Sequence, residues 1–286
     1  MTSHDFSDYK SGIATLIGRP NVGKSTLLNA ILGTKVSIVS DKVQTTRRRI
    51  RGILNRPNLQ IIFTDTPGIH KPQSLLGEQM NETAMESNQD SDVSIFVLDA
   101  TSPIGKGDRF IAKDLPSGTL IVLNKIDRAS PNQILKQLSI ASEFGAEQYF
   151  PVSAITGQGI DVLLEAVIAK LPDSVPYFPL DAMSDVPESW WVSELVREQL
   201  LERTKDELPH SIECRITEWE LPYIRCEIIV ERDSQKPIVI GKRGQVLKEV
   251  GMAVRSQLNP GIYLELAVKV DKNWQDKPES LRRLGY

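Results

Sequence analysis

The stretch GRPNVGKS occupies residues 18–25 and has the form GxxxxGKS. It follows the apolar run Ile13–Ile17 and leads into the helix-favouring segment Ser25–Leu32, so we expect a strand, a glycine-rich turn and a helix. Such a turn points backbone N–H groups at a bound phosphate. Lys24 then places its charge on the β- and γ-phosphates, and the Ser25 hydroxyl ligates magnesium. An ordinary strand-to-helix turn is the alternative.

A second motif, DTPG at residues 65–68, follows the apolar run Ile61–Phe63. At the end of a strand, Asp65 can hold magnesium through water and the Gly68 N–H can sense the γ-phosphate. A nucleoside triphosphate site needs a second motif of this kind after its phosphate-binding loop. DTPG therefore favours a phosphate site at residues 18–25 over an ordinary turn.

Two more motifs specify the base. NKID at residues 124–127 follows Leu120–Leu123, and the Asp127 carboxylate can accept both N–H groups of a guanine edge, which adenine lacks. SAITG at residues 153–157 follows Tyr149–Val152 and can support the base. Four motifs at successive strand ends predict a guanine-nucleotide site. Its expected contacts are Gly18, Asn21, Val22, Gly23, Lys24, Ser25, Thr26, Asp65, Gly68, Asn124, Lys125, Asp127, Ser153 and Ala154.

Residues 34–49, TKVSIVSDKVQTTRRR, are neither clearly helical nor alternating and lie where a first switch loop is expected. Of the adjacent threonines Thr45 and Thr46, we expect Thr46 to complete the magnesium shell when the γ-phosphate is bound. We interpret Arg47–Arg49 as a solvated turn. The predicted magnesium ligands are Ser25, Thr46 and Asp65.

The remaining N-terminal pattern predicts an α/β domain. Ile50–Leu54 and Leu59–Phe63 flank a turn signal and indicate a hairpin. Val93–Leu98 is apolar except for Ser94, a pattern typical of a strand that helices cover on both faces. A closing amphipathic helix is indicated by apolar residues at helical spacing, namely Ile160, Leu163, Leu164, Val167, Ile168 and Leu171. We expect a mostly parallel sheet with right-handed crossovers.

The expected domain boundaries follow from composition. Residues 69–89 are polar with no strong period, which favours a mobile second switch, and Met1–Ser11 is expected to be frayed. We therefore predict a GTP-binding domain over residues 1–171, ordered from about residue 12. Residues 172–188 carry Pro172, Pro176, Pro179 and Pro187 and are predicted to form a proline-stiffened linker.

Residues 189–286 are predicted to form a second, smaller α+β domain with a C-terminal tail. The patterns give a helix, two strands, a helix, the sequence GKRG at 241–244, a helix and a strand. A GxxG pair alone is usually a plain turn. Here its central residues are basic and Ile238–Ile240 precede it as an apolar wall, an arrangement with which KH modules clamp single-stranded RNA. The candidate RNA contacts are Ile240, Gly241, Lys242, Arg243 and Gly244; an interaction domain without nucleic acid is the alternative.

Composition limits the other classes of function. The 34 basic and 37 acidic residues give a net charge of −3, so any nucleic-acid site must be local. No apolar stretch at the N-terminus resembles a signal peptide or membrane span, and we expect a cytoplasmic protein. Cys214 and Cys226 have no CxxC or HxxxH partner, which favours small core residues over a metal site built from cysteine.

Together GRPNVGKS, QTTR at 44–47, DTPGIH, NKID, SAITGQG, VIGKRG and the terminal LRRLGY resemble the Era GTPases, from about Ile13 to Tyr286. The resemblance implies a P-loop GTPase domain and a type II KH domain, with GTP, GDP and Mg²⁺ as ligands. It further implies binding to the 3′ end of 16S ribosomal RNA, assembly of the small (30S) ribosomal subunit, and association with the inner face of the membrane. We see no amphipathic or polybasic anchor for that association, and we expect a monomer.

The resemblance also bears on hydrolysis. Ile69 stands where a Ras-like enzyme has a water-orienting glutamine, so we expect slow intrinsic turnover. Related GTPases with an asparagine in the P-loop use it to bind potassium, and Asn21 occupies that place. The candidate catalytic residues are Lys24, Asn21 and Thr46.

Two other functions fit parts of the pattern. An RNA chaperone whose nucleotide merely sets its shape would show no turnover beyond a single stoichiometric event. A related enzyme that modifies transfer RNA, or one with two G domains, is disfavoured because the chain has a single GKS loop and no modifying-enzyme cysteine near its C-terminus.

Overall fold

The computed structural model describes residues 8–205 and 208–286. Contacts divide these residues into two compact units. The first comprises the described part of Met1–Ser37 together with Thr46–Lys71 and Met80–Asp185, and the second comprises Ile38–Thr45, Pro72–Gln79 and the described part of Val186–Tyr286. Each unit has its own hydrophobic core.

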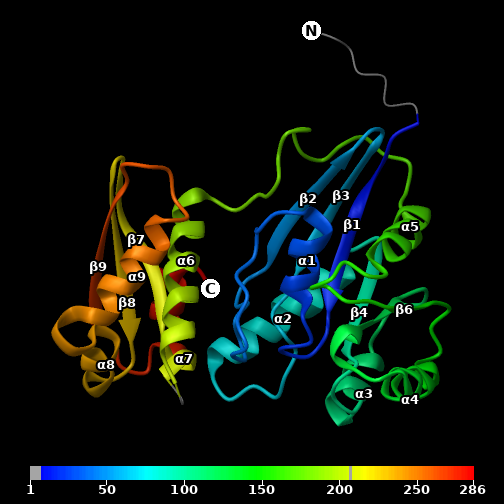
Figure 1. Ribbon diagram of the computed structural model, residues 1–286, viewed down its shortest axis with the longest axis horizontal. Helices are drawn as coiled ribbons and strands as arrows, with labels where there is room; N and C mark the ends of the chain where they lie inside the picture. Colours follow the sequence, from blue (N-terminus) through cyan, green and yellow to red (C-terminus); the bar gives the residue numbers. More distant parts are fainter. Residues whose placement is uncertain (1–7, 206–207) are drawn as a thin grey trace, which may run out of the picture. The chain divides into compact units, whose positions relative to one another are not determined.

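The described part of the first unit is built on a six-stranded sheet with the order β2-β3-β1-β4-β5-β6. Its strands are β1 (Lys10–Ile17), β2 (Ile50–Arg56), β3 (Leu59–Asp65), β4 (Val93–Asp99), β5 (Leu120–Asn124) and β6 (Tyr149–Pro151). Only the β2–β3 pair is antiparallel, and these two strands form the long hairpin beside β1 in Figure 1. The sequence predictions of a hairpin and a mostly parallel sheet are confirmed.

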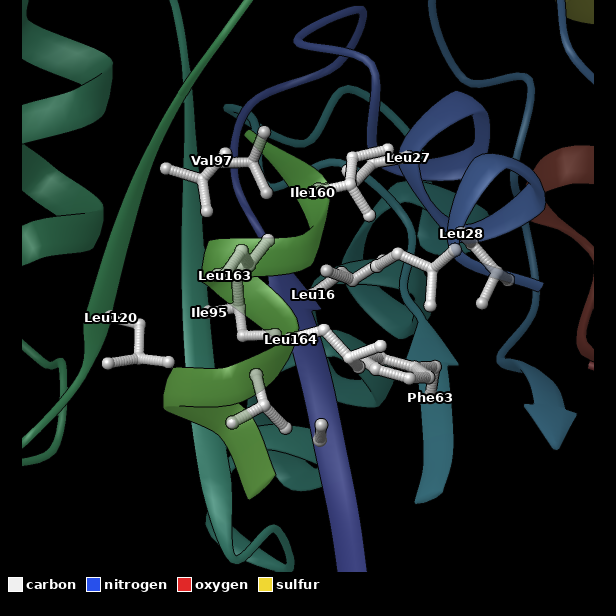
Figure 2. Packing of buried hydrophobic residues seen from close by; sticks show 14 of the residues in the cluster. Leu16, Leu27, Leu28, Phe63, Ile95, Val97, Leu120, Ile160, Leu163 and Leu164 are labelled. Atoms are coloured by element: carbon white, nitrogen blue, oxygen red, sulfur yellow. The ribbon is translucent and has the colours of Figure 1, made fainter. Parts of the chain in front are cut away.

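Helices cover both faces of this sheet. The helices on one face are α1 (Lys24–Leu32) and α5 (Ile160–Lys170); those on the other are α2 (Leu75–Gln89), α3 (Lys106–Ala112) and α4 (Pro131–Ala141). Figure 2 shows Leu27 and Leu28 of α1, and Leu163 and Leu164 of α5, gathered over the sheet around Leu16 and its neighbours. Burial on both faces explains why β4 is mostly apolar, with Ser94 and the terminal Asp99 as its polar residues. The phosphate-binding turn starts at the carboxyl end of β1, whose last four residues, Ala14–Ile17, are buried.

The start of the chain differs from the expectation. The segment predicted to be frayed lies outside the described residues as far as Ser7, but Lys10 and Ser11 belong to β1, so order begins earlier than residue 12. Hydrogen bonds fix this start, because Lys10 N donates to Asn58 O and Ser11 N donates to Pro172 O.

Residues 172–185 pack against the first unit. Ile53 N of β2 donates to Met183 O at 2.9 Å, and Gly52 forms an antiparallel bridge with Ser184. Gln60, which is fully buried, accepts hydrogen bonds at Oε1 from the backbone of Tyr177 and Phe178. Its Nε2 donates to Asn55 Oδ1 and Phe178 O. Three of the four hydrogen bonds of this one amide fasten the proline-rich segment, and the fourth joins it to Asn55 of β2.

Both expected switch segments differ in part from the prediction. Residues 34–49 contain no helix or strand, as predicted. Arg47, however, is buried, so the interpretation of Arg47–Arg49 as a solvated turn is wrong at that residue. Residues 75–89 form helix α2 rather than an irregular loop. Its buried side chains, Leu76, Met80, Ala84, Ser87 and Asn88, do recur at helical spacing, but several are small or polar and gave no apolar period.

The second unit has a three-stranded sheet, in the order β7-β8-β9, within the residues described. Its elements are α6 (Glu188–Arg203), α7 (Leu208–Ser211), β7 (Glu213–Glu220), β8 (Tyr223–Val230), α8 (Lys236–Ile240), α9 (Gln245–Arg255), β9 (Tyr263–Val270) and α10 (Pro278–Leu284). The β7–β8 pair is antiparallel and the β8–β9 pair is parallel. Helices α6 and α9 lie along the sheet (Figure 1) and share its core. The predicted α+β order is confirmed.

Candidate guanine-nucleotide site and RNA interface

The phosphate-binding loop joins β1 to α1 as predicted, and its backbone can be traced to specific contacts. Gly23 has φ 96°, and a Cβ there would come within 2.3 Å of Asn124 Nδ2, so only glycine fits. Lys24 is 6% exposed, and its Nζ donates to Gly18 O and Arg19 O, both at 3.1 Å. Burial lowers the pKa of Lys24 to about 8, and nearby Asp65 only partly opposes this. The loop holds an ammonium group that an anionic phosphate would stabilise.

Four side-chain oxygens converge beside Lys24. Asp65 Oδ2 accepts hydrogen bonds from Ser25 Oγ at 2.6 Å, Ser37 Oγ at 2.9 Å and Thr46 Oγ1 at 3.2 Å. The Oγ atoms of Ser25 and Thr46 are 2.9 Å apart. The three predicted magnesium ligands thus lie together, and Ser37 is a fourth member that no sequence motif indicated.

This oxygen cluster fits magnesium. Asp65 is fully buried, and its second oxygen, Oδ1, has no hydrogen-bond partner. A buried carboxylate oxygen without a partner is costly, and burial raises the pKa of Asp65 despite the opposing effect of Lys24 and the three hydroxyl donors. Magnesium prefers hard oxygen ligands of this kind.

The hydroxyl groups of the adjacent residues Thr45 and Thr46 have different partners. Thr46 joins the oxygen cluster, whereas the Thr45 hydroxyl donates to Lys42 O. The Thr45 carbonyl accepts from Arg197 Nη2 within the second unit.

The NKID motif links the phosphate-binding loop to the SAITG motif at residues 153–157. Asn124 Nδ2 donates to Val22 O at 3.0 Å, and its Oδ1 accepts from Ala154 N at 3.0 Å. Lys125 Nζ donates to Asn21 O at 2.5 Å. Asn21 and Val22 therefore contribute backbone carbonyls that fix the loop, in addition to any contact with a nucleotide. Ile69 N donates to Gly18 O at 3.2 Å, which brings Gly68 beside the same loop.

Asp127 is oriented by a neighbour. Ser153 Oγ donates to Asp127 Oδ1 at 2.6 Å and accepts from Thr156 N at 3.1 Å. Ser153 thus holds the predicted guanine acceptor in place, which gives the expected base support a specific form. The Ala154 N–H is used by Asn124, so Ala154 contributes structure to the loop.

A hollow of about 550 Å³ lies between α1 and the SAITG loop. Of the predicted contacts, Thr26 and Ala154 reach it. Its lining is Thr26, Asn29, Ala30, Gly33, Thr34, Lys35, Ala154, Ile155, Thr156 and Gly157. The residues at the end of α1, Asn29 to Lys35, carry no motif, and sequence reasoning missed them.

The GKRG loop of the second unit joins α8 to α9. Gly241 has φ 75°, and a Cβ there would lie 2.5 Å from Val246 Cγ2, so the close turn requires glycine. Gly244 has open space on its Cβ side, and Lys242 and Arg243 are exposed. The apolar wall needs one correction. Val239 is fully buried in the core, so of the three residues before the loop only Ile238, which is exposed, and the half-buried Ile240 can face a ligand.

Comparison with known proteins agrees with this geometry. Residues 13–125 match the family described as 50S ribosome-binding GTPase, and residues 207–275 match the KH domain. GTPase Era of Clostridium botulinum (strain Eklund 17B / Type B) is 44% identical over 291 residues, covering 97% of this chain and 99% of that protein. This chain belongs to the Era family of GTPases. GTPase Era of Mycobacterium avium (strain 104) is 42% identical, covering 98% and 100% of the two chains.

Two solved Era structures are similar to this chain with a TM-score of 0.92 and 40% identity, covering 97% of this chain and 99% of theirs. One is an Aquifex aeolicus Era variant bound to GDP and AlF₄⁻. The other is Era in complex with MgGDPNP and nucleotides 1506–1542 of 16S ribosomal RNA. The family resemblance is confirmed, and this protein is a GTPase with a C-terminal KH domain.

Proposed function

We propose that this Era-family GTPase binds single-stranded RNA at the 3′ end of 16S ribosomal RNA through its KH domain, and that it assists assembly of the small (30S) ribosomal subunit in the cytoplasm. The GKRG loop carries the proposal, because two exposed cations stand between glycines and next to the exposed Ile238. The Era complex with the corresponding nucleotides supports it. Peripheral association with the inner membrane face rests on the family resemblance alone. None of the helices within residues 8–205 and 208–286 is long and apolar enough to cross a bilayer.

The RNA chemistry follows from the shape of the loop. With no side chain at Gly244, a phosphate can approach the backbone, and Lys242 and Arg243 supply charge beside it. Unstacked bases then lie along Ile238 and Ile240. A duplex hides its bases and cannot use this wall, so we expect a single-stranded target.

The nucleotide chemistry is hydrolysis of GTP by water to GDP and phosphate. Lys24 neutralises charge on the β- and γ-phosphates, and Asp127, held by Ser153, selects guanine. Magnesium, held by Ser25, Thr46 and Asp65, would supply further positive charge to the phosphates. Ile69 is buried in the core on the face of the sheet that α2, α3 and α4 cover, and it cannot orient a water molecule. We therefore expect slow intrinsic turnover.

A potassium ion bound at Asn21 is proposed to supply additional positive charge that speeds GTP hydrolysis. Asn21 has φ 64° and an exposed side chain in the phosphate loop. We expect GTP hydrolysis to be faster in potassium than in sodium buffer, and Asn21→Ala to remove the difference. Equal rates of the unaltered protein in the two buffers would refute the potassium site and leave the GTPase activity in place.

The decisive experiment measures RNA affinity in each nucleotide state. A labelled RNA of the 3′-terminal 16S sequence, a scrambled RNA and a duplex of the same sequence are titrated with the full chain bound to a GTP analogue, to GDP or to no nucleotide. We expect the single-stranded 3′ sequence to bind best. If the nucleotide state controls the switch loops, affinity should differ by about 5- to 150-fold between the GTP and GDP states. Equal binding of all three RNAs would overturn the proposed target.

A further inference from the structure

Asp99, which belongs to none of the four nucleotide motifs, holds the lysine of NKID. Lys125 Nζ lies 2.6 Å from Asp99 Oδ2 and 2.5 Å from Asn21 O. The ammonium group therefore bridges a carboxylate at the end of β4 and the backbone of the phosphate-binding loop.

Strand pairing brings these residues together. In the parallel β4–β5 register, Asp99 is the partner of Asn124, and Ala100 N donates to Asn124 O at 2.9 Å. Lys125 follows directly in the left-handed conformation, with φ 67° and ψ 34°. That uncommon backbone turns the lysine out of the strand line, where its side chain reaches both Asp99 and the phosphate loop.

Asp99 is itself held rigidly. Its Oδ1 accepts hydrogen bonds from Thr101 N at 2.8 Å and Thr101 Oγ1 at 2.6 Å, which leaves Oδ2 directed at Lys125. Burial by itself raises the pKa of Asp99, but the hydrogen bonds from Lys125 and Thr101 outweigh it and the net pKa is lowered. Asp99 is thus a fixed, charged acceptor at neutral pH.

The pair is more than a surface salt bridge. The side chains of Lys125 and Asp99 are 23% and 11% exposed, whereas ion pairs of small value are solvent-exposed on both sides. The third member of the contact, Asn21, has φ 64°, a left-handed conformation that asparagine adopts more readily than most residues other than glycine. The Lys125 ammonium is one of the groups that hold it.

We propose that Asp99 is a positioning residue for nucleotide binding. It holds the Lys125 ammonium against the Asn21 carbonyl and so keeps the phosphate-binding loop at a fixed distance from the NKID motif. The inference rests on the proposed roles of Asn21 and Lys125 in the nucleotide site. When the Asp99–Lys125 contact is weakened, bound nucleotide should dissociate faster, because the phosphate-binding loop and the NKID motif no longer keep a fixed spacing. The preference for guanine should stay, because Asp127 and Ser153 are untouched.

The test uses the full chain and the dissociation rate of a fluorescent GDP analogue. Asp99→Asn keeps the size and one acceptor oxygen but removes the charge and turns the other oxygen into an NH₂ donor, and Asp99→Ala removes both acceptors. Since hydrogen bonds to charged groups are strong, we expect dissociation about tenfold faster or more for Asp99→Asn, and faster still for Asp99→Ala. Thr101→Val, which only loosens Asp99, should give a smaller increase and serves if the Asp99 variants fold poorly.

A double-mutant cycle separates positioning from general stability. In a Lys125→Met background the lysine is gone, so Asp99→Asn should change the dissociation rate no further. If the two changes add fully, Asp99 acts elsewhere and the inference fails. Asp92→Asn is the matched control. Asp92 directly precedes the first residue of β4, and its Oδ2 accepts from Ile13 N. We expect the nucleotide dissociation rate of this variant to be unchanged.

Failure of the inference can be told from failure of the nucleotide site. If the unaltered protein binds guanine nucleotide and rejects adenine, but Asp99→Asn, Asp99→Ala and Thr101→Val all leave dissociation unchanged, only the role of Asp99 is refuted. If Asp99→Asn also abolishes the guanine preference, Asp99 acts on the base rather than through Lys125, which again overturns the inference. If Asp127→Asn leaves base preference unchanged in the same assay, the proposed site itself is wrong.

Discussion

Arg19 of the phosphate-binding loop forms an ion pair with Asp108 in the first turn of α3, with 2.9 Å between Nε and Oδ1. The Asp108 side chain is 2% exposed, and its Oδ2 accepts from Gly105 N at 2.9 Å to cap the helix. The backbone carbonyl of the same arginine accepts from Lys24. One buried carboxylate thus anchors both a short helix and the residue that helps hold the phosphate lysine.

The first prediction concerns this anchor. Asp108→Asn keeps a cap acceptor but loses the ion pair, and because Arg19 is 34% exposed we expect a loss of about 1–2 kcal/mol in unfolding free energy rather than the full cost of a buried pair. Asp108→Ala also loses the cap, for about 1 kcal/mol more. Urea unfolding measures both. Asp114→Asn, just beyond the exposed end of α3, is the control; an Asp108→Ala protein as stable as this control would contradict the anchor.

The second prediction concerns base choice. Asp127→Asn should lose guanine and gain xanthine, because a site built around paired polar groups rejects a base that leaves them unpaired. Ser153→Ala removes the donor that orients Asp127 and should weaken GDP binding by about tenfold without changing the preferred base. Competition of GTP, ATP and XTP against a labelled nucleotide measures both effects. Equal binding of ATP and GTP by the unaltered protein would rule out this assignment.

The third prediction is a pH dependence. Burial puts the pKa of Lys24 at about 8 in the free protein, and bound phosphates favour the charged form, so the pKa must rise in the complex. Below about pH 8 the lysine is already charged and GDP affinity should be flat; above it, binding takes up a proton and affinity should fall by up to about tenfold per pH unit. Calorimetry at pH 8.5 in two buffers of different ionisation enthalpy measures this uptake. Lys24→Arg stays charged and should show none, and an unaltered protein that binds GDP without proton uptake would disprove the linkage.

The fourth prediction concerns the GKRG loop. Gly244→Asp puts bulk and negative charge where a phosphate approaches, so it should abolish RNA binding while GDP binding survives. Lys242→Ala and Arg243→Ala should weaken all RNA sequences alike, and each should reduce the salt slope by about 0.7 if it contacts one phosphate. Filter binding at several salt concentrations measures both. Full RNA binding by Gly244→Asp would reduce the loop to a plain turn.

The sequence was most informative where chemistry demands fixed spacing. The four nucleotide motifs lie at the carboxyl ends of their strands, as expected, because each motif contains its own turn residues. These motifs are the phosphate-binding loop, DTPG, NKID and SAITG. The choice of Thr46 over Thr45 agrees with the oxygen cluster for the same reason, since only one of two adjacent side chains can face Asp65.

What escaped prediction depends on contacts between distant residues. Ser37, Asp99 and Asp108 touch the nucleotide motifs only after the sheet is assembled, and a single carboxylate or hydroxyl carries no spacing signal. Helix α2 was missed because its buried side is partly small and polar. Val239 was assigned to the RNA groove because three consecutive apolar residues do not reveal which of them points inward on a short helix.

The four hydrogen bonds of Gln60 bear on how the GTPase unit can be isolated. Strand β2 is an edge of the sheet, and an edge with open N–H and C=O groups invites pairing with other chains. Residues up to Asp185 occupy that edge, through Met183, Ser184 and the amide of Gln60. A truncation after Leu171 would expose the edge and leave the Gln60 amide with only its bond to Asn55 out of the four, and the fragment should aggregate. A truncation after Asp185 keeps the edge covered, and should give a soluble fragment that binds GDP.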